Sequence, residues 1–327
     1  MDRFHPPNNQ HATDGSASGS AIDPLNSEFQ WIGGRRYFTH APYLLPYDDG
    51  EFTRLDFEHH LVRQAFKTNV LAPVGQPRMI LDVGMGTGRW ALEVTTQFPT
   101  ATVVGMDLVR PPTIEHIAQD LRGQGWGQAS GQAPGQAQGY PTGHPSNFTF
   151  VAGNILSRLP FHDDSFDYVH MRFLSAAIPL AGWRQALFEL ARVTRRGGWV
   201  EVVDTSWTPF NGGSATEQLF YWARIAGMVR EINLELAAWM GSLFLDSGFG
   251  NVTAPRLQLP MGRAGGRIGS MVAANAMAVA EAIQPWVVSY NIASAEAFAG
   301  ALAAARSEVA DGASCAYPIF VAYGQRL

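Results

Sequence analysis

The chain has 327 residues, of which 46% are hydrophobic and 16% charged, with a net charge of −5 at pH 7. This composition is typical of a globular protein, and the acidic balance argues against nucleic acid bound through a basic surface. The single cysteine, Cys315, excludes an internal disulfide and a zinc site built from cysteines, which suits a reducing compartment. No apolar run approaches the roughly 20 residues of a membrane span, so we expect no membrane partner.

The first 75 residues divide into a tail and a segment that precedes the first core strand. Residues 1–28 are small and polar without periodicity, which predicts a disordered tail. Residues 29–75 are rich in aromatic side chains and include a predicted helix at 51–70. We expect this segment to cover a ligand site; the alternative is that its aromatic residues only pack the helix onto the core. For His59 and His60, on this helix, we expect solvated or capping roles, with a base as the alternative.

Residues 79–107 read as strand, glycine turn, helix, strand and acid, which is typical of a nucleotide-binding βαβ unit. Glycines permit positive φ and let a ligand approach the backbone. The turn directs backbone N–H groups at a helix N-terminus toward the ligand. An acid about 20 residues past the glycines accepts the hydroxyl hydrogens of a ribose. The residues that form this pattern are Asp82, Gly84, Gly86, Gly88 and Asp107.

Beyond this unit the sequence predicts alternating strands and helices, interrupted by an insertion at 123–147. The insertion repeats Gly, Gln and Ala without an apolar period, which predicts a mobile connection. A helical region is predicted at 214–247. An Ala-rich helical insertion follows at about 262–312, and we expect part of it to form a lid over the ligand crevice; the alternative is that its apolar stripe packs in the core. Strands are predicted at 148–152, 166–172, 199–204, 247–260 and 316–324.

The strand at 166–172 is expected to end at the ligand, because open α/β sheets bind ligands outside the carboxyl ends of their strands. This places Met171 and Arg172 near the ligand. For Met171 the alternative is core packing, and for Arg172 the alternatives are a surface ion pair or a substrate contact. We expect His170 to be a buried histidine with its hydrogen bonds satisfied.

Three motifs carry a resemblance to a known family. Residues 82–88 read D-x-G-x-G-x-G, which resembles motif I of class I S-adenosyl-L-methionine (SAM)-dependent methyltransferases. The run LPFHDDSFD at 159–167 resembles a second motif of these enzymes. The run YLLPYD at 43–48, with the matching C-terminal residues 316–325, resembles the LaeA-like methyltransferases, known mostly from fungal secondary-metabolite regulation.

The resemblance implies an α/β, Rossmann-like class I methyltransferase fold. Its seven-stranded, mostly parallel sheet would occupy residues 76–327, with the N-terminal helical cover at 29–75 and the helical insertion before the last strand. The implied cofactor is SAM, and no metal is expected. The family's acid that accepts from the adenine amino group is replaced by Asn154, which keeps an acceptor oxygen. The expected cofactor-binding residues are Asp82, Gly84, Met85, Gly86, Gly88, Asp107, Leu108, Asn154, Ile155 and Met171.

The reaction implied is transfer of the sulfonium methyl to an N, O or C atom of an acceptor. The first hypothesis is a small-molecule acceptor in specialised metabolism; the alternatives are a LaeA-like regulatory or binding protein with little turnover, and a protein methyltransferase. No catalytic base is identified, and the candidates are Tyr43, His60, His170 and Asp204. We expect a cytoplasmic protein, or a nuclear one if it is fungal, compatible with a homodimer.

Overall fold

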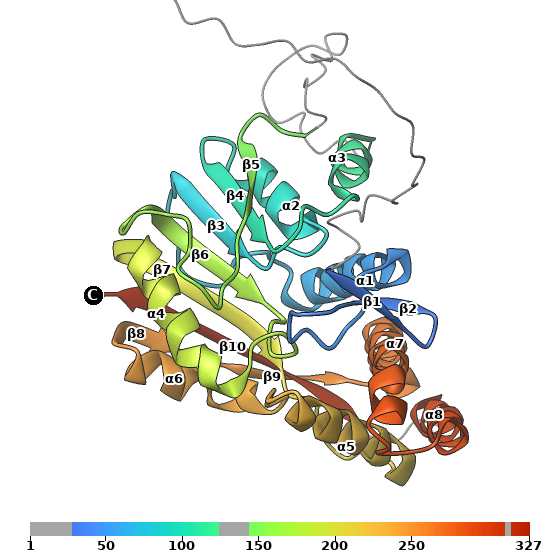
Figure 1. Ribbon diagram of the computed structural model, residues 1–327. Coiled ribbons are helices and arrows are strands. Elements are labelled where there is room, and N and C mark those ends of the chain that lie inside the picture. The colour runs from blue at the N-terminus through green and yellow to red at the C-terminus, as the bar shows by residue number, and fades with distance from the viewer. Residues whose placement is uncertain (1–27, 124–143, 311–314) are drawn as a thin grey trace, which may run out of the picture.

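The computed structural model describes residues 28–123, 144–310 and 315–327 (Figure 1). The predicted tail at 1–28 and the predicted mobile connection at 123–147 lie outside these residues, apart from their edges. The described residues form one large sheet with helices on both faces and a small N-terminal hairpin.

The large sheet has the strand order β5-β4-β3-β6-β7-β10-β8, with β9 also paired to β10. The first five strands are parallel, whereas β10 runs antiparallel to its three partners. This confirms the Rossmann-like, mostly parallel sheet. The strands are β3 (Met79–Val83), β4 (Thr102–Asp107), β5 (Phe148–Ala152), β6 (Phe166–Arg172), β7 (Thr194–Thr205), β8 (Phe249–Thr253), β9 (Arg256–Pro260) and β10 (Ala316–Arg326).

The single strand predicted at 247–260 is two strands in the structure. β8 and β9 are separated at Ala254 and Pro255, and both pair with the 11-residue strand β10. Pro255 has no N–H to donate to a ladder, and this favours the break between β8 and β9 at this position. The carbonyl of Pro255 still accepts from the backbone N–H of Val321, which keeps the bend attached to β10.

Helices cover both faces of the sheet because successive strand residues point to opposite sides. Ile80 and Tyr168 belong to the core formed with α2 and α3, whereas Leu81 and Val169 belong to the core formed with α4 and α6. Buried side chains of both cores line the strands of the parallel half, which is therefore apolar on both faces. These helices are α2 (Arg89–Gln97), α3 (Ile114–Gly123), α4 (Trp183–Val193) and α6 (Met240–Asp246).

The N-terminal segment begins with a hairpin that the sequence analysis did not predict, β1 (Phe29–Ile32) and β2 (Arg35–Phe38). Helix α1 (Asp49–Phe66) follows. Its start is set by Asp48, whose carboxylate accepts from the backbone N–H of Glu51 at 2.9 Å and pairs with Arg35 at 2.6 Å. Its end comes earlier than the predicted residue 70, because Lys67 adopts a left-handed φ of 62° and terminates the helix.

The Ala-rich insertion forms α7 (Gly266–Ser289) and α8 (Ala295–Ala310), and it is not the expected lid. These helices pack with α5 (Ser214–Val229) and α1, on the outer side of the N-terminal segment (Figure 1). The Tyr37 hydroxyl donates to the carbonyl of Ala282 at 2.7 Å, and the Trp286 indole donates to the carbonyl of Leu44 at 2.8 Å. The insertion therefore packs against the outer side of the N-terminal segment and holds it in place through these two hydrogen bonds. Short 3₁₀ turns at Leu180–Gly182, Leu236–Trp239 and Arg263–Gly265 complete the described helices.

Helix α7 also departs from the expectation about apolar length. The stretch Arg263–Ser289 is long and apolar enough to cross a membrane by length and composition, with a mean hydropathy of 1.3 over its most apolar window. Small residues spread this hydropathy along the helix, so no continuous apolar run marks it in the sequence. In the structure 56% of that window is buried against other helices, which is the environment of a core helix.

Candidate active site

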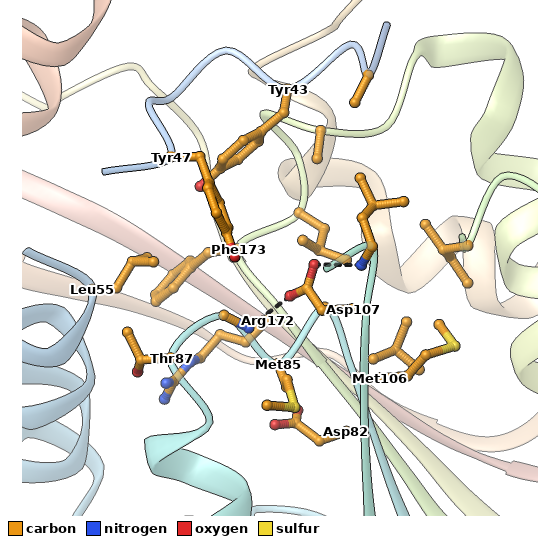
Figure 2. A pocket seen from close by; sticks show the side chains of 18 of the residues that line it. Tyr43, Tyr47, Leu55, Asp82, Met85, Thr87, Met106, Asp107, Arg172 and Phe173 are labelled. Carbon is orange, nitrogen blue, oxygen red and sulfur yellow. Dashed lines mark hydrogen bonds between the residues drawn. The ribbon is translucent and has the colours of Figure 1, made fainter. Parts of the chain in front are cut away.

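A cavity opens at the carboxyl ends of β3, β4 and β6, between the sheet and the N-terminal segment. Asp82, Met85 and Asp107 lie on the sheet side, and Tyr43 and Tyr47 lie opposite them (Figure 2). The location follows the rule for open α/β sheets. The residues of the N-terminal segment and of α1 that line it are Phe38, Ala41, Pro42, Tyr43, Pro46, Tyr47, Phe52, Leu55, Glu58 and His59.

The glycine turn forms the edge of the cavity below α2. Gly84, Gly86 and Gly88 have φ values of 67°, 57° and 86°, a conformation that other residues rarely adopt. The backbone N–H groups of Gly84 and Met85 donate to the carbonyl of Met106, at 2.8 and 3.0 Å, so the turn is tied to β4. A Cβ on Gly84 would approach the Leu174 side chain to 2.6 Å. The turn therefore requires glycine for both its conformation and its space.

Asp107 ends β4 and joins it to the turn. Its Oδ2 accepts from the backbone N–H of Gly86 at 2.8 Å, and its Oδ1 accepts from the N–H of Leu108 at 2.7 Å. Burial raises the pKa of this carboxyl to about 6, although both hydrogen bonds favour its charged form. Each carboxylate oxygen has a second lone pair, so the group still offers two acceptors to a pair of ribose hydroxyls.

Asp82 and His170 form a buried pair at the ends of the neighbouring strands β3 and β6. His170 Nδ1 lies 2.8 Å from Asp82 Oδ1, and its ring stacks on Trp90 with centroids 3.7 Å apart. His170 is thus buried and paired, as the sequence analysis expected. Asp82 Oδ2 is buried and has no hydrogen-bond partner among the described residues. Because Asp82 lines the cavity, this oxygen is available to a bound cation.

The opposite end of the cavity is formed by residues that follow β5. Gly153, Asn154, Ile155 and Leu156 line it. Asn154 Oδ1 accepts from the backbone N–H of Leu156 at 2.9 Å, so the oxygen predicted to face adenine also stabilises a local turn. Its second lone pair remains, and no hydrogen bond within the described residues uses the N–H of Ile155. An acceptor and a donor are therefore next to each other, as an adenine edge requires.

Two of the expected cofactor residues do not line the cavity. Gly88 is the N-cap of α2, and the space at its Cβ position is occupied by Met85 and Ile114. Met171 is fully buried in the core beside α4. Its neighbours on β6, His170 and Arg172, point to the cavity side, so the alternation of strand side chains directs Met171 to the opposite face. The packing alternative holds for Met171.

Of the four candidate bases, two line the cavity and two do not. Tyr43 and His170 line the cavity. His60 is exposed and contacts Gln64, and Asp204 lies outside the cavity, where it accepts from Ser175 and Thr205. Among the described residues no group of three or more His, Cys, Asp or Glu side chains is arranged to hold a metal ion.

Sequence reasoning missed a polar cluster that α1 brings to the cavity. Glu58 accepts from Asn275 of α7 at 2.8 Å and pairs with Arg54 at 3.0 Å, and its side chain lines the cavity. Asp56 accepts from the Thr87 hydroxyl at 2.6 Å and so ties α1 to the glycine turn. The available signal was charged residues at helical spacing among the apolar positions of α1, since such residues become buried with the stripe.

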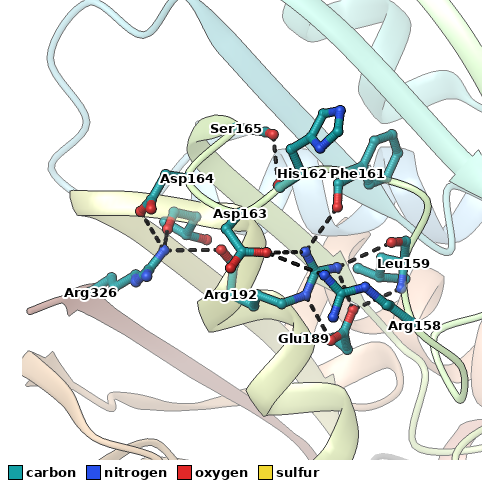
Figure 3. Close-up of polar contacts among 11 residues, drawn as sticks. Arg158, Leu159, Phe161, His162, Asp163, Asp164, Ser165, Glu189, Arg192 and Arg326 are labelled. Carbon is teal, nitrogen blue, oxygen red and sulfur yellow. Dashed lines mark hydrogen bonds and ion pairs between the residues drawn. The ribbon is translucent and has the colours of Figure 1, made fainter.

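The motif at 159–167 has a structural role beside the cavity (Figure 3). Arg192 of α4 pairs with Glu189 at 2.6 Å and with Asp163 at 2.7 Å. It also donates to the carbonyls of Phe161 and Leu159, at 2.8 and 3.1 Å. Arg192 thereby fixes the loop that leads from the Asn154 turn into β6, and this loop lies outside the cavity except near Leu156.

A family model described as a methyltransferase domain matches residues 81–202. Residues 81–202 are a methyltransferase domain. The match begins in β3 and ends in β7, and so includes the glycine turn, Asp107, Asn154 and Arg172. This agrees with the class I SAM-dependent family that the motifs resemble.

Three curated relatives extend the comparison. "Methyltransferase str3" of Strobilurus tenacellus is 33% identical over 166 residues, covering 50% of this chain and 49% of that protein. "Protein-methionine methyltransferase laeA" of Emericella nidulans is 30% identical over 204 residues, covering 60% and 46%. "Methyltransferase pytC" of Aspergillus terreus is 24% identical over 266 residues, covering 76% and 71%. The chain spans about half the length of the first two.

SAM is the cofactor that this methyltransferase domain implies, and the cavity residues fit it. The unpartnered oxygen of Asp82 suits an ammonium group, and at Gly86 the nearest atom to a Cβ position is 3.6 Å away, in Leu55. Asp107 offers acceptors where a ribose would lie, and the Asn154 turn offers an adenine-sized edge with one acceptor and one donor. The order along the cavity matches the order of groups in SAM.

Proposed function

We propose that the protein transfers the methyl group of SAM to a small-molecule acceptor of specialised metabolism. The observation that supports this most strongly is the position of the N-terminal segment. Tyr43, Tyr47 and α1 lie across the cavity from the cofactor-side residues, so the methyl group would be transferred inside an enclosed space (Figure 2). An enclosed cavity suits a small acceptor better than a protein segment.

The aromatic residues of the cavity favour an acceptor with an apolar, flat portion. Phe38, Tyr43, Tyr47, Phe52 and Phe173 all line it. Aromatic side chains provide large, rigid contact surfaces for flat ligands. They also exclude water from the reacting atoms, which limits hydrolytic side reactions.

When bound, SAM supplies a methyl group activated by its sulfonium. The protein's part is to align the acceptor lone pair with the carbon–sulfur bond that breaks, which is a positioning effect. Asp107 and the glycine turn would hold the ribose and methionine ends, and Asn154 with Ile155 would hold adenine. An acceptor hydroxyl must also lose a proton.

Among the groups that line the cavity we assign Glu58 to receive such a proton, since His170, a candidate base in the same cavity, is already paired with Asp82. Burial raises the pKa of the Tyr43 hydroxyl well above its usual value, so this group stays protonated. Burial lowers the pKa of His59, whose two ring nitrogens both face partners. Glu58 presents a carboxylate held in place by Arg54 and Asn275.

The second candidate function is a regulatory one. It is favoured by relatives that are themselves described as "Secondary metabolism regulator laeA", among them the protein of Aspergillus flavus, which is 30% identical over 203 residues. A fold of this class does not by itself establish turnover. The experiment must therefore separate binding of SAM from transfer of its methyl group.

The deciding experiment incubates the purified chain with methyl-labelled SAM and an extract of the source organism, and then fractionates the label. Label in small molecules that is lost in Asp107→Ala supports the metabolic enzyme. Label in protein indicates a protein methyltransferase. SAM binding by calorimetry without any transfer supports the regulatory reading, and absence of SAM binding contradicts the proposal altogether.

A further inference from the structure

Asn275 is a side-chain amide buried among the apolar and aromatic residues of α7, which packs beside α1 (Figure 1). It is 6% exposed, and burying an amide costs free energy unless its groups are hydrogen-bonded. Its Oδ1 accepts from Arg54 Nη1 at 3.0 Å, and its Nδ2 donates to Glu58 Oε1 at 2.8 Å. A guanidinium only donates and an ionised carboxylate only accepts, so these partners determine the orientation of the amide. Asn275 thus ties α7 to two charged residues of α1.

The two oxygens of Glu58 have different surroundings. Oε1 accepts from Asn275 and lies 3.0 Å from Arg54 Nη1. Oε2 takes part in no hydrogen bond among the residues that the structure describes. The Glu58 side chain keeps 12% of its surface exposed, and it lines the cavity. One oxygen is therefore anchored, and the other is available to a molecule in the cavity.

The neighbouring charges leave Glu58 negative. Arg54 Nε lies 3.0 Å from both carboxylate oxygens of Glu51, and Arg54 Nη2 lies 2.6 Å from Oε1 of the same group. Arg54 is thus shared between two carboxylates, and with both of them ionised the three side chains carry one excess negative charge. Asn275 gives Glu58 a second donor without adding a positive charge. The carboxylate is therefore held in place and keeps its charge, as a group that receives a proton requires.

We propose that Asn275 is a positioning residue for methyl transfer, which holds Glu58 Oε1 so that Oε2 receives the proton of an acceptor hydroxyl. In this step the hydroxyl oxygen forms a bond to the methyl carbon, the carbon–sulfur bond breaks with its electron pair on sulfur, and the proton passes to Oε2. The inference rests on the proposed function. It goes further because it makes the acceptor a hydroxyl compound and gives α7 a part in the reaction in addition to packing.

The test measures single-turnover transfer of labelled methyl from SAM to the small-molecule fraction of the source-organism extract. Calorimetry with S-adenosylhomocysteine measures cofactor-site binding in the same samples. Asn275→Leu keeps the approximate size of the side chain and removes both hydrogen bonds. Transfer should slow by at least about 10-fold, within the roughly 10²- to 10⁴-fold contribution of a positioned base. S-adenosylhomocysteine affinity should change by less than about twofold, because Asn275 does not line the cavity.

The matched control for this substitution is Met277→Leu. Met277 is buried in the same helix and does not line the cavity. Exchanging one apolar side chain for another of similar volume disturbs a core little. Met277→Leu should therefore change neither the transfer rate nor the affinity for S-adenosylhomocysteine.

A double-mutant cycle separates positioning from folding. Glu58→Gln has no carboxylate to receive the proton and should slow transfer by about 100-fold or more. Adding Asn275→Leu to Glu58→Gln should cause less than about a twofold further loss, because no base remains to be positioned. Equal losses from Asn275→Leu in the two backgrounds would mean that Asn275 only supports the fold, and would overturn the inference.

The labelled product tests the class of acceptor. A methyl ether resists dilute alkali and releases its label as methyl iodide in hot hydriodic acid, and this is the expected result. Label that alkali releases as methanol would identify a methyl ester, and so a carboxylate acceptor with no proton for Glu58. Label that resists both treatments would identify a carbon acceptor. Either of these two results overturns the inference and leaves the proposed function in place.

Two further outcomes distinguish this inference from the function on which it rests. Unchanged transfer in Glu58→Gln or in Asn275→Leu would overturn the inference alone, because methyl transfer would then proceed without the positioned carboxylate. If the unaltered chain bound S-adenosylhomocysteine but transferred no label, the proposed function would fall together with this inference.

Discussion

The carboxylate of Asp107 accepts a hydrogen bond from the backbone N–H of Gly86, at 2.8 Å, across the mouth of the glycine turn. The acid at the end of β4 therefore organises the turn in addition to offering acceptors to a ribose. Its two oxygens each receive one backbone N–H, from Gly86 and Leu108, and burial still raises its pKa to about 6. Ribose binding favours the charged carboxylate, whereas burial disfavours its charge and so lowers the stability of the fold.

Replacing Asp107 should separate these two effects. Asp107→Ala removes acceptors for the ribose and leaves the Gly86 N–H unpaired, so we expect SAM affinity to fall by at least about 10-fold. Asp107→Asn keeps one acceptor and removes the buried charge, but its NH2 group faces one of the two backbone N–H donors. It should therefore lower both SAM affinity and the free energy of unfolding at pH 7 less than Asp107→Ala does. Calorimetry with SAM and urea denaturation measure the two effects. Unchanged SAM affinity in Asp107→Ala would show that the ribose assignment is wrong.

The raised pKa of Asp107 predicts a pH dependence of cofactor binding. A protonated carboxyl keeps only part of its acceptor capacity, so SAM affinity should fall as the pH decreases through about 6. Stability should change in the opposite sense. The native pKa lies above the unfolded value of 3.8, so the native state binds the extra proton between these values, and this group's contribution to stability rises as the pH falls from about 6 to 3.8.

The control for this pH dependence is Asp107→Asn, whose SAM affinity should be flat across pH 5 to 7. Asp204 has a pKa of about 6 for a similar reason, burial, but it does not line the cavity. It therefore contributes to the pH dependence of stability and not to that of binding. A SAM affinity that still falls below pH 6 in Asp107→Asn would assign the effect to another group.

Gly84 should tolerate no side chain. Gly84→Ala places a Cβ at a φ of 67° and within 2.6 Å of the Leu174 side chain. We expect a loss of about 1–3 kcal/mol in the free energy of unfolding, the cost of a residue held in a sparsely populated conformation, and a loss of SAM binding. Gly75→Ala is the matched control, since Gly75 has no neighbour within 4 Å of its Cβ position and no positive φ. Equal effects of the two substitutions would contradict the assigned role of the turn.

The sequence was sufficient wherever a short run of residues determines the geometry. The glycine turn, Asp107 and the Asn154 turn are local motifs, and all of them contribute residues to one cavity, although Gly88 of the turn does not line it. The assignment of Met171 failed because it depended on which face of β6 points to the cavity. The sequence of β6 does not determine this face; the stacking of His170 on Trp90 shows it. The sequence therefore predicted which strand ends at the cavity, but not which face of that strand each side chain occupies.

Tertiary packing determined the remaining features. The contact between His59 and Arg172 joins residues 113 positions apart, and its formation depends on how α1 docks against β6. The Ala-rich insertion has an apolar stripe that suits a lid and a core helix equally. Its packing against the N-terminal segment depends on the long-range hydrogen bonds of Tyr37 and Trp286, and no local sequence pattern predicts these bonds.

Tyr37 should prove to be a structural link between the cover and α7. Tyr37→Phe removes the hydrogen bond to the carbonyl of Ala282 and should cost about 1 kcal/mol of stability. Its more specific consequence is faster hydrogen exchange in residues 29–47, with the exchange of β3 and β4 unchanged, because local opening follows the contacts that are lost. Tyr221→Phe is the control, since Tyr221 is 50% exposed. Faster exchange throughout the sheet would contradict a local role.

Arg192 should matter for stability and little for cofactor binding. It is 7% exposed and bonds Glu189, Asp163 and two backbone carbonyls (Figure 3). Arg192→Met leaves the buried carboxylate of Glu189 without its cation, which should lower the free energy of unfolding by about 3–5 kcal/mol.

The control for Arg192→Met is the double variant Arg192→Met with Glu189→Gln, which removes the unpaired charge and should recover part of the loss. Urea denaturation measures both, and calorimetry with SAM should give affinities close to that of the unaltered chain for any variant that remains folded. A large loss of SAM affinity in the folded double variant would mean that the loop at 159–167 orients the Asn154 turn, because this loop is the connection between Arg192 and the cavity.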